Sequence, residues 1–310
     1  MKKIIIDTDI GTDVDDAIAL ILALRSSELK VEAVTTVYGD VDLRSKIVIK
    51  LLSLMGKLNE FPIASGVSEP LLKNHDIFWA GHEGEGILTD EDNKDLKPIR
   101  KHAVDLIIEK IMDNPGEITL LLIGPLTNMA TAIIKEPLIA RNMKEIIMMG
   151  GVARIFENAL SLPYIEHNIK CDPESASVVF RSNIPITMVG LDVTTKVPIN
   201  RSQLEQIKKI NNPLMNSLSN MIEIFWDFTK RKLGWSGNES PMHDPLAIGV
   251  SMYPNIIKTV QCKVLVETVG QYTTGQTIVV PDSTGNVKVA YDVDSQRFID
   301  LLMNRILIKG

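Results

Sequence analysis

Short apolar runs alternate with amphipathic segments along the first two thirds of the chain. The runs contain few polar positions, which is typical of strands that are covered on both faces of a parallel sheet. Strands are predicted at Lys3–Ile6, Val31–Val37, Pro62–Ala64, Ile118–Ile123, Glu145–Met149 and Ile186–Val189. Helices are predicted between them at Asp15–Leu24, Leu43–Met55, His102–Met112, Leu126–Ile134 and Pro173–Phe180. This alternation predicts an α/β fold with a doubly wound, mostly parallel central sheet flanked by helices.

The last third of the chain predicts an extra helical region and a set of C-terminal strands. Helices are predicted at Ser202–Ile210, Pro213–Lys232 and Asp294–Ile308, and strands at Cys262–Val269, Gln276–Val280 and Val287–Tyr291. Since no Pro-, Gly- or Ser-rich linker interrupts the sequence, residues 1–310 are expected to form a single domain. The polar, glycine-bearing segment Gly81–Asp95 is expected to be a mobile loop.

Composition excludes several classes of protein. With 45% hydrophobic residues the chain can bury a sizeable core, which excludes disorder. Apolar runs such as Ile118–Ile123 are far shorter than the ~20 residues that cross a bilayer, so no membrane partner is expected. A net charge of −6 argues against nucleic acid as a partner. The two cysteines, Cys171 and Cys262, and the lack of a long apolar run after Met1 predict a reduced, cytoplasmic location.

A cluster of acidic residues follows the first predicted strand. Residues 4 to 24 hold five carboxylates and no Lys, Arg or His. The carboxylates are Asp7, Asp9, Asp13, Asp15 and Asp16. They leave the carboxyl end of a predicted central strand, which is where ligands bind in open α/β sheets.

The repulsion within this cluster points to a bound cation. Two carboxylates about 5 Å apart repel by roughly 3 kcal/mol at an effective dielectric constant near 20. Several such pairs require full solvation, raised pKa values or a cation. Oxygen-only donors suit a hard divalent ion, and no set of Cys and His suggests zinc. The alternative is a solvated acidic loop in which Asp15 or Asp16 caps the following helix.

The cluster resembles the N-terminal motif of the nucleoside hydrolases, the inosine–uridine preferring family. That motif is most often Asp-Thr-Asp-Pro-Gly-x-Asp-Asp-Ala-x-Ala; here Ile10 replaces Pro and two extra residues precede Asp15-Asp16. Later segments agree with the family in order and approximate spacing. They are Val34-Thr35-Thr36-Val37-Tyr38-Gly39, Gly124-Pro125-Leu126-Thr127-Asn128, Met149-Gly150-Gly151, Glu166-His167-Asn168, Asp172-Pro173-Glu174-Ser175-Ala176 and His243-Asp244-Pro245.

The resemblance implies hydrolysis of the N-glycosidic bond of ribonucleosides at a Ca²⁺ ion. The implied metal ligands are the carboxylates of Asp9, Asp16 and Asp244 and the main-chain carbonyl of Ile123. Asp15 would bind the ribose diol. Family members are commonly homodimers or homotetramers, so self-association is expected by analogy.

Further substrate-binding residues follow from the same resemblance. Glu166 and Asn168 match residues that hold the sugar, and Asn158 is a less closely spaced match for another. Asp40 stands where the family usually has Asn, which places an additional carboxylate near the sugar. His243 matches the residue that protonates the departing base in part of the family.

The side chains suit this chemistry. Cleavage of an N-glycosidic bond passes through an oxocarbenium-like transition state and needs an activated water together with protonation of the leaving base. Asp9 would take the proton from the water, and a histidine such as His243, with a pKa near ~6.5, suits a general acid. A site built around two hydroxyl groups is expected to reject deoxyribose.

Structural roles compete with several of these functional roles. Asp172-Pro173 and Asp244-Pro245 both have the pattern of a helix N-cap followed by Pro, and this role is expected for Asp172. For Asp244 metal ligation is favoured, and the two roles are compatible. Trp226 is expected in the core, although one of Trp79, Trp226 or Trp235 is a candidate to stack on the base.

Two other functions remain open from the sequence. A haloacid-dehalogenase-type phosphatase also places Asp-x-Asp after its first strand, with Asp7 then as the nucleophile. These phosphatases have Gly-Thr directly after the second Asp of the motif. In this chain Ile10 follows Asp9 instead. A non-catalytic protein that binds ribonucleosides or Ca²⁺ would have lost the base or the acid, but Asp9 and His243 are both present.

Overall fold

A nine-stranded sheet forms the centre of the computed structural model, which describes residues 1–73, 76–154, 164–234 and 237–308. Its strands are β1 (Lys2–Thr8), β2 (Leu29–Thr36), β3 (Ile63–Ser65), β4 (Thr119–Leu122), β5 (Glu145–Met149), β6 (Ile186–Val189), β9 (Ile257–Val266), β10 (Thr277–Pro281) and β11 (Val287–Val293). They lie in the order β10-β9-β11-β6-β5-β4-β1-β2-β3. Two short strands, β7 (Pro198–Asn200) and β8 (Glu239–Pro241), pair separately.

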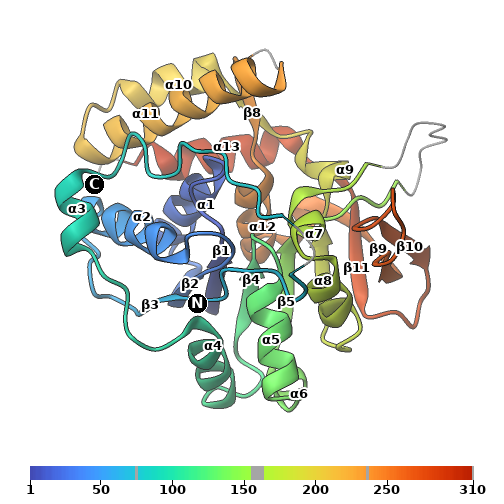
Figure 1. The fold of residues 1–310 in the computed structure, drawn as a ribbon. Helices are drawn as coiled ribbons and strands as arrows, with labels where there is room; N and C mark the ends of the chain where they lie inside the picture. Colours follow the sequence, from blue (N-terminus) through green and yellow to red (C-terminus); the bar gives the residue numbers. More distant parts are fainter. Residues whose placement is uncertain (74–75, 155–163, 235–236, 309–310) are drawn as a thin grey trace.

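Helices cover both faces of this sheet (Figure 1). One face carries α1 (Asp15–Leu24), α2 (Val41–Leu54), α10 (Arg201–Lys208), α11 (Pro213–Phe228), α12 (His243–Met252) and α13 (Ser295–Ile306). The other face carries α4 (Ala103–Met112), α5 (Thr127–Lys135), α6 (Ile139–Asn142) and α8 (Pro173–Phe180). Shorter helices are α3 (Asp90–Asp95), α7 (His167–Cys171) and α9 (Leu191–Thr194).

The strand order confirms the predicted doubly wound, mostly parallel sheet. Strand β1 pairs in parallel with β2 on one side and with β4 on the other. The chain first builds outward through β2 and β3, then returns across β1 to build β4, β5 and β6. The antiparallel part is confined to β9, which pairs with β10 and β11. The direction of winding therefore reverses between β1 and β4, and ligands bind at such a switch point.

Alternating side chains of β1 supply two separate cores. Ile4 and Ile6 are fully buried in the cluster that lies under α1 and α12. Ile5 is fully buried in the cluster under α4 and α5. Because both faces need apolar residues, the strand reads as a continuous apolar run, as the sequence predicted.

The structure differs from the sequence predictions at three places. Helix α12 was not predicted, because it is buried almost all round and so lacks the polar face that marks an amphipathic helix. The helix predicted to end at Lys232 ends at Phe228 and continues as the π-helix Thr229–Leu233. The segment Gly81–Asp95 is not loop throughout, because its last six residues form α3. Thr89 and Asp92 form a capping box at the start of this helix.

The carboxyl ends of β1 and β2 are tied to α5 by one buried amide. Asn128 donates through Nδ2 to Asp7 Oδ1 at 2.7 Å and to the carbonyl of Thr36 at 3.0 Å. Its Oδ1 accepts the amide of Val67 at 2.8 Å. Asn128 therefore has a structural role, and the residue fixes the edge of the sheet from which the acidic segment starts.

Replacing Asn128 by Ala is expected to lower the free energy of unfolding by about 3 kcal/mol, because buried partners of the amide lose their hydrogen bonds. Urea unfolding followed by circular dichroism measures the change. Asn216→Ala is the matched control, because Asn216 lies exposed on α11. Equal stability of the two variants would contradict this account of Asn128.

Candidate active site

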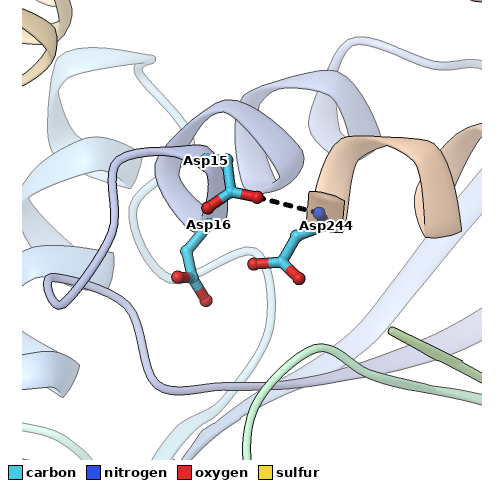
Figure 2. A group of neighbouring side chains, drawn as sticks. All are labelled: Asp15, Asp16 and Asp244. Carbon is cyan, nitrogen blue, oxygen red and sulfur yellow. Dashed lines mark hydrogen bonds between the residues drawn. The ribbon is translucent and has the colours of Figure 1, made fainter. Parts of the chain in front are cut away.

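Three buried carboxylates from opposite ends of the chain meet above the switch point. Asp15 and Asp16 begin α1, and Asp244 lies in the first turn of α12. One oxygen atom of each lies within 4.8 Å of the others. Figure 2 shows the three side chains between the two helix ends. Their exposed fractions are 1%, 2% and 4%, so solvent does not screen their repulsion.

The two helices are joined directly at this point. The amide of Asp244 donates to Asp15 Oδ2 at 2.9 Å, the dashed bond in Figure 2. The amino ends of α1 and α12 both face the carboxylates, and the positive ends of the helix dipoles stabilise negative charge there. Contact between residues 15 and 244 thus brings together the start and the far end of the sequence.

The capping roles considered for these residues are wrong, whereas that of Asp172 is confirmed. Helix α1 has Val14 at its N-cap, with no side-chain bond to the helix. Helix α12 begins at His243, so Asp244 lies inside the helix and does not cap it. Asp172 caps α8 by accepting the amide of Ser175 at 3.0 Å.

Asp9 lies beside the three carboxylates, at the first position of the loop that follows β1. It is 4% exposed. Gly124 follows β4 and passes so close that a Cβ there would lie 2.9 Å from Asp9 Oδ1. A side chain at position 124 would therefore displace Asp9. Asp15, which was predicted to bind the substrate, is one of the three carboxylates whose oxygen atoms lie close together. Asp9 lies next to these three and is not one of them.

The electrostatics of the cluster favour a cation. Burial raises the pKa of Asp16 well above its ordinary value, and the charges of Asp9 and Asp15 raise it further. Burial and the charges of Asp15 and Asp16 act in the same way on the pKa of Asp244. The pKa of Asp9 is also raised by burial, although the charge of Arg44 lowers it. Oxygen donors with this much unrelieved repulsion fit a hard divalent ion.

Asn168 joins the carboxyl ends of two neighbouring strands. Its Nδ2 donates to the carbonyls of Ile123 and Met149, each at 3.2 Å. The carbonyl of Ile123, a predicted metal ligand, thus lies directly after β4. Its oxygen accepts a hydrogen bond from Asn168 and has a second lone pair with which it can bind a metal ion. Glu166 is 3% exposed and caps α7 by accepting the amides of Asn168 and Ile169 at 2.8 and 3.1 Å.

His243 links the carboxylates to an open cavity. It is half-buried and lies next to Asp244 in α12. Its Nδ1 lies 2.7 Å from Thr194 Oγ1, and burial lowers its pKa. The cavity has a volume of about 680 Å³, enough for a nucleoside, and His243 lines it together with Arg154 and Lys196.

One of the predicted substrate-binding residues is not brought into this group. Asp40 is exposed and caps α2, where its Oδ1 accepts the amide of Leu43 at 2.9 Å. This capping bond explains the acidic residue at position 40, and no role in ligand binding is needed to explain it. Asn158 lies outside the described residues, so its predicted role stays a prediction.

Comparison with known proteins identifies the family. The sequence model of the inosine-uridine preferring nucleoside hydrolases matches residues 4–300. The chain belongs to this family. It is 36% identical to the pyrimidine-specific ribonucleoside hydrolase RihA of Photobacterium profundum, over 98% of each chain. It is 35% identical to the enzyme of the same name from Salmonella typhimurium, over 98% of this chain and 97% of the other.

Solved structures agree with this assignment. A purine-preferring ribonucleoside hydrolase from Gardnerella vaginalis superposes with a TM-score of 0.84 at 30% identity, covering 99% of this chain and 98% of the other. A plant nucleoside hydrolase gives a TM-score of 0.84 at 29% identity, with 99% of each chain covered. The chain is therefore an N-glycosidase that hydrolyses ribonucleosides to base and ribose. This activity replaces the phosphatase and the non-catalytic binder as interpretations of the acidic cluster.

Among the described residues, no helix combines the length and the apolar character needed to cross a bilayer.

Three residues at the site were not found from the sequence. Thr8 donates to Asp16, and Thr194 holds the ring of His243. Arg44 donates to the carbonyl of Asp9. Only Arg44 left a signal, because it occupies the apolar face of the predicted helix Leu43–Met55, three positions before Ile47. A hydroxyl residue such as Thr8 or Thr194 is too common to single out.

The metal-free protein is expected to lose stability as the pH rises from about 4 to 7. Burial raises the pKa of Asp7 from 3.8 to about 7, and its Oδ2 has no partner in the described part of the chain. The folded state then holds a proton that the unfolded state releases, so each pH increase within this window favours unfolding. This increase in the pKa of Asp7 corresponds to a cost on the order of 4 kcal/mol at neutral pH.

Urea unfolding between pH 5 and 8, with a chelator present, measures this dependence. Asp7→Asn removes one titrating group at nearly constant shape and is expected to flatten the curve. A variant with the slope of the wild-type protein would rule out Asp7 as a source of the pH dependence.

Proposed function

We propose that this hydrolase uses Ca²⁺, with Asp9 as the base that activates water and His243 as the acid that protonates the leaving base. The observation that carries the proposal is the convergence of Asp15, Asp16 and Asp244, with His243 adjacent. An acid beside a carboxylate cluster is the arrangement that glycosidic hydrolysis needs.

The donor set supports Ca²⁺ as the metal. Asp9, Asp16, Asp244 and the carbonyl of Ile123 would hold the ion, and Asp15 would accept hydrogen bonds from the ribose diol. Ca²⁺ takes 6–8 oxygen ligands in a flexible shell, which leaves positions for water and two hydroxyl groups. When bound, the ion lowers the pKa of water and offsets the charge of the cluster.

The raised pKa of Asp9 suits a general base. A carboxylate in water is too weak a base to take a proton from water, and burial increases its affinity for the proton. The main-chain carbonyl of Asp9 is bound by Arg44, which restrains the residue. Held in this way, Asp9 would accept the proton of the attacking water.

His243 would act from the opposite side of the scissile bond. The contact of Nδ1 with Thr194 fixes the ring, so Nε2 is the nitrogen left to reach the base. Burial lowers the pKa of His243, which makes its protonated form a stronger acid. The cavity beside it would receive the nucleobase.

The sugar would be held by Glu166, Asn168 and Asn158. The amide of Gly151 donates to Glu166 Oε2 at 3.0 Å, in addition to the two amides of α7. A carboxylate fixed by three amides would be positioned to stabilise a sugar that becomes cationic in the transition state. We further propose that the chain forms homodimers or homotetramers and acts on free ribonucleosides.

Base release from a panel of ribonucleosides tests the reaction. The panel contains uridine, cytidine, inosine and adenosine, because the compared relatives include pyrimidine-specific and purine-preferring enzymes. Release measured by chromatography is expected with Ca²⁺, to fall at least 10³-fold for 2′-deoxy substrates, and to be lost in Asp9→Ala. A protein that cleaves deoxynucleosides equally well, or without metal, would contradict the diol and metal assignments.

The pH profile tests His243. The kcat/KM of the wild-type enzyme is expected to fall as the pH rises through the pKa of His243, which lies below 6.5, because the acid must be protonated. His243→Ala is expected to lose about 10²–10⁴-fold in kcat and to lose this limb of the profile. Thr194→Val is the control, because it removes only the orienting contact and should keep the limb. An unchanged limb in His243→Ala would assign the acid to another group.

A further inference from the structure

Arg44 is a fully buried cation on α2 that the proposed reaction does not use. Its exposed fraction is 0%, and it is the largest of the fully buried side chains in the described part of the chain. Burial of a guanidinium group costs free energy unless its donors are paired. A hydrophobic residue would fill the same space without this cost, so the contacts of Arg44 indicate what the charge is for.

The guanidinium group binds the loop that carries Asp9. Its Nη1 donates to the carbonyl of Asp9 and, at 2.9 Å, to that of Ile10. Its Nη2 donates to Thr12 Oγ1 at 2.9 Å, and its Nε donates to the carbonyl of Tyr38 at 2.6 Å. All three nitrogens are therefore engaged, and two of them hold residues 9 to 12 between β1 and α1.

An aromatic ring fixes the plane of the guanidinium group. The Cζ atom of Arg44 lies 5.0 Å from the centre of the Trp79 ring, a cation–π contact. The Trp79 ring can approach Arg44 because Gly39 has no side chain. A Cβ at position 39, where φ is +73°, would lie 2.7 Å from the ring. Arg44 is thus held between the indole and the loop, with little freedom to adopt another arrangement.

Among the described residues, the charge of Arg44 is not consumed by an ion pair. Its hydrogen-bond acceptors are three main-chain carbonyls and one hydroxyl group, all of them neutral. The guanidinium charge is therefore held against the loop that carries Asp9, where it opposes the negative charge of the acidic cluster. A forked donor and a fixed positive charge are combined in one residue.

We infer that Arg44 is a positioning residue, which holds residues 9 to 12 so that Asp9 faces the cation site and which reduces the repulsion among the carboxylates. This inference rests on the proposed function, because it assigns Arg44 a role toward the Ca²⁺ held there. The length of the acidic loop gives a reason for this restraint. A loop that lacks the Pro of the common motif and has two more residues loses more conformational entropy when it is ordered.

Arg44→Lys is the main test, because it keeps the charge and removes the fork. Arg25→Lys is the matched control: Arg25 follows α1 at its far end and also donates to a carbonyl, that of Ile306. Calorimetric titration with Ca²⁺ gives the dissociation constant, and kinetics at saturating Ca²⁺ give kcat and KM. Thermal unfolding gives the loss of stability in each variant.

Arg44→Lys is expected to weaken Ca²⁺ binding at least tenfold and to lower kcat at least tenfold, with KM changed less than threefold. Arg25→Lys is expected to lower the melting temperature while both values stay within twofold of wild type. A purely structural Arg44 would behave like Arg25. Ca²⁺ affinity and kcat of Arg44→Lys within twofold of wild type would therefore overturn the inference.

Thr12→Val tests the same contact if Arg44→Lys does not fold, because it removes one acceptor of the guanidinium group from the half-buried loop. A threefold or greater loss of Ca²⁺ affinity is expected, and wild-type affinity would overturn the inference. Wild-type protein that neither binds Ca²⁺ nor releases base would instead overturn the proposed function. The two failures are thus separate results.

Discussion

The repulsion among buried carboxylates is the interaction on which the rest of the site depends. Asp9, Asp16 and Asp244 each have a raised pKa, with burial as the largest cause and the charge of Asp15 as a further cause in all three. The protein opposes this repulsion with helix amino ends, with a hydroxyl bond from Thr8 to Asp16, and with the charge of Arg44. These contributions reduce the repulsion without removing it. The site is therefore unfavourable alone and favourable with a divalent ion, which is how binding of a ligand stabilises a fold.

The doubly wound sheet is what allows such a site to exist. Strand β1 lies between β2 and β4, and the helices that follow β1 and β4 pack on opposite faces of the sheet. Gly124 lets these loops approach each other closely, and Asn168 joins the ends of β4 and β5. Buried apolar residues hold both faces of the sheet rigidly beneath this edge. The polar residues can therefore be strained and charged, because the stability of the domain comes from elsewhere.

The fold and part of the site could be predicted from the sequence because each left a local pattern. Strands buried on both faces are apolar throughout, and the acidic segment is dense enough to be seen without any partner. The environment of Asp244 could not be derived in this way, since Asp-Pro is also the pattern of a cap and α12 has no polar face. Which of Asp9 and Asp15 joins the group of close carboxylates depends on where their side chains point. The position of Arg44 depends on contacts with residues far away in the sequence. Such features are set by tertiary structure, which periodicity does not record.

The bond between the Asp244 amide and Asp15 spans 229 positions of the chain. During synthesis, the acidic loop leaves the ribosome long before residue 244 does, at a rate of roughly 5–20 residues per second. For roughly 10 to 45 seconds Asp15 and Asp16 are consequently without Asp244, and a divalent ion would find only a partial set of ligands. The complete group of carboxylates exists only once the chain is almost finished, so binding of a metal ion there would report the completion of folding.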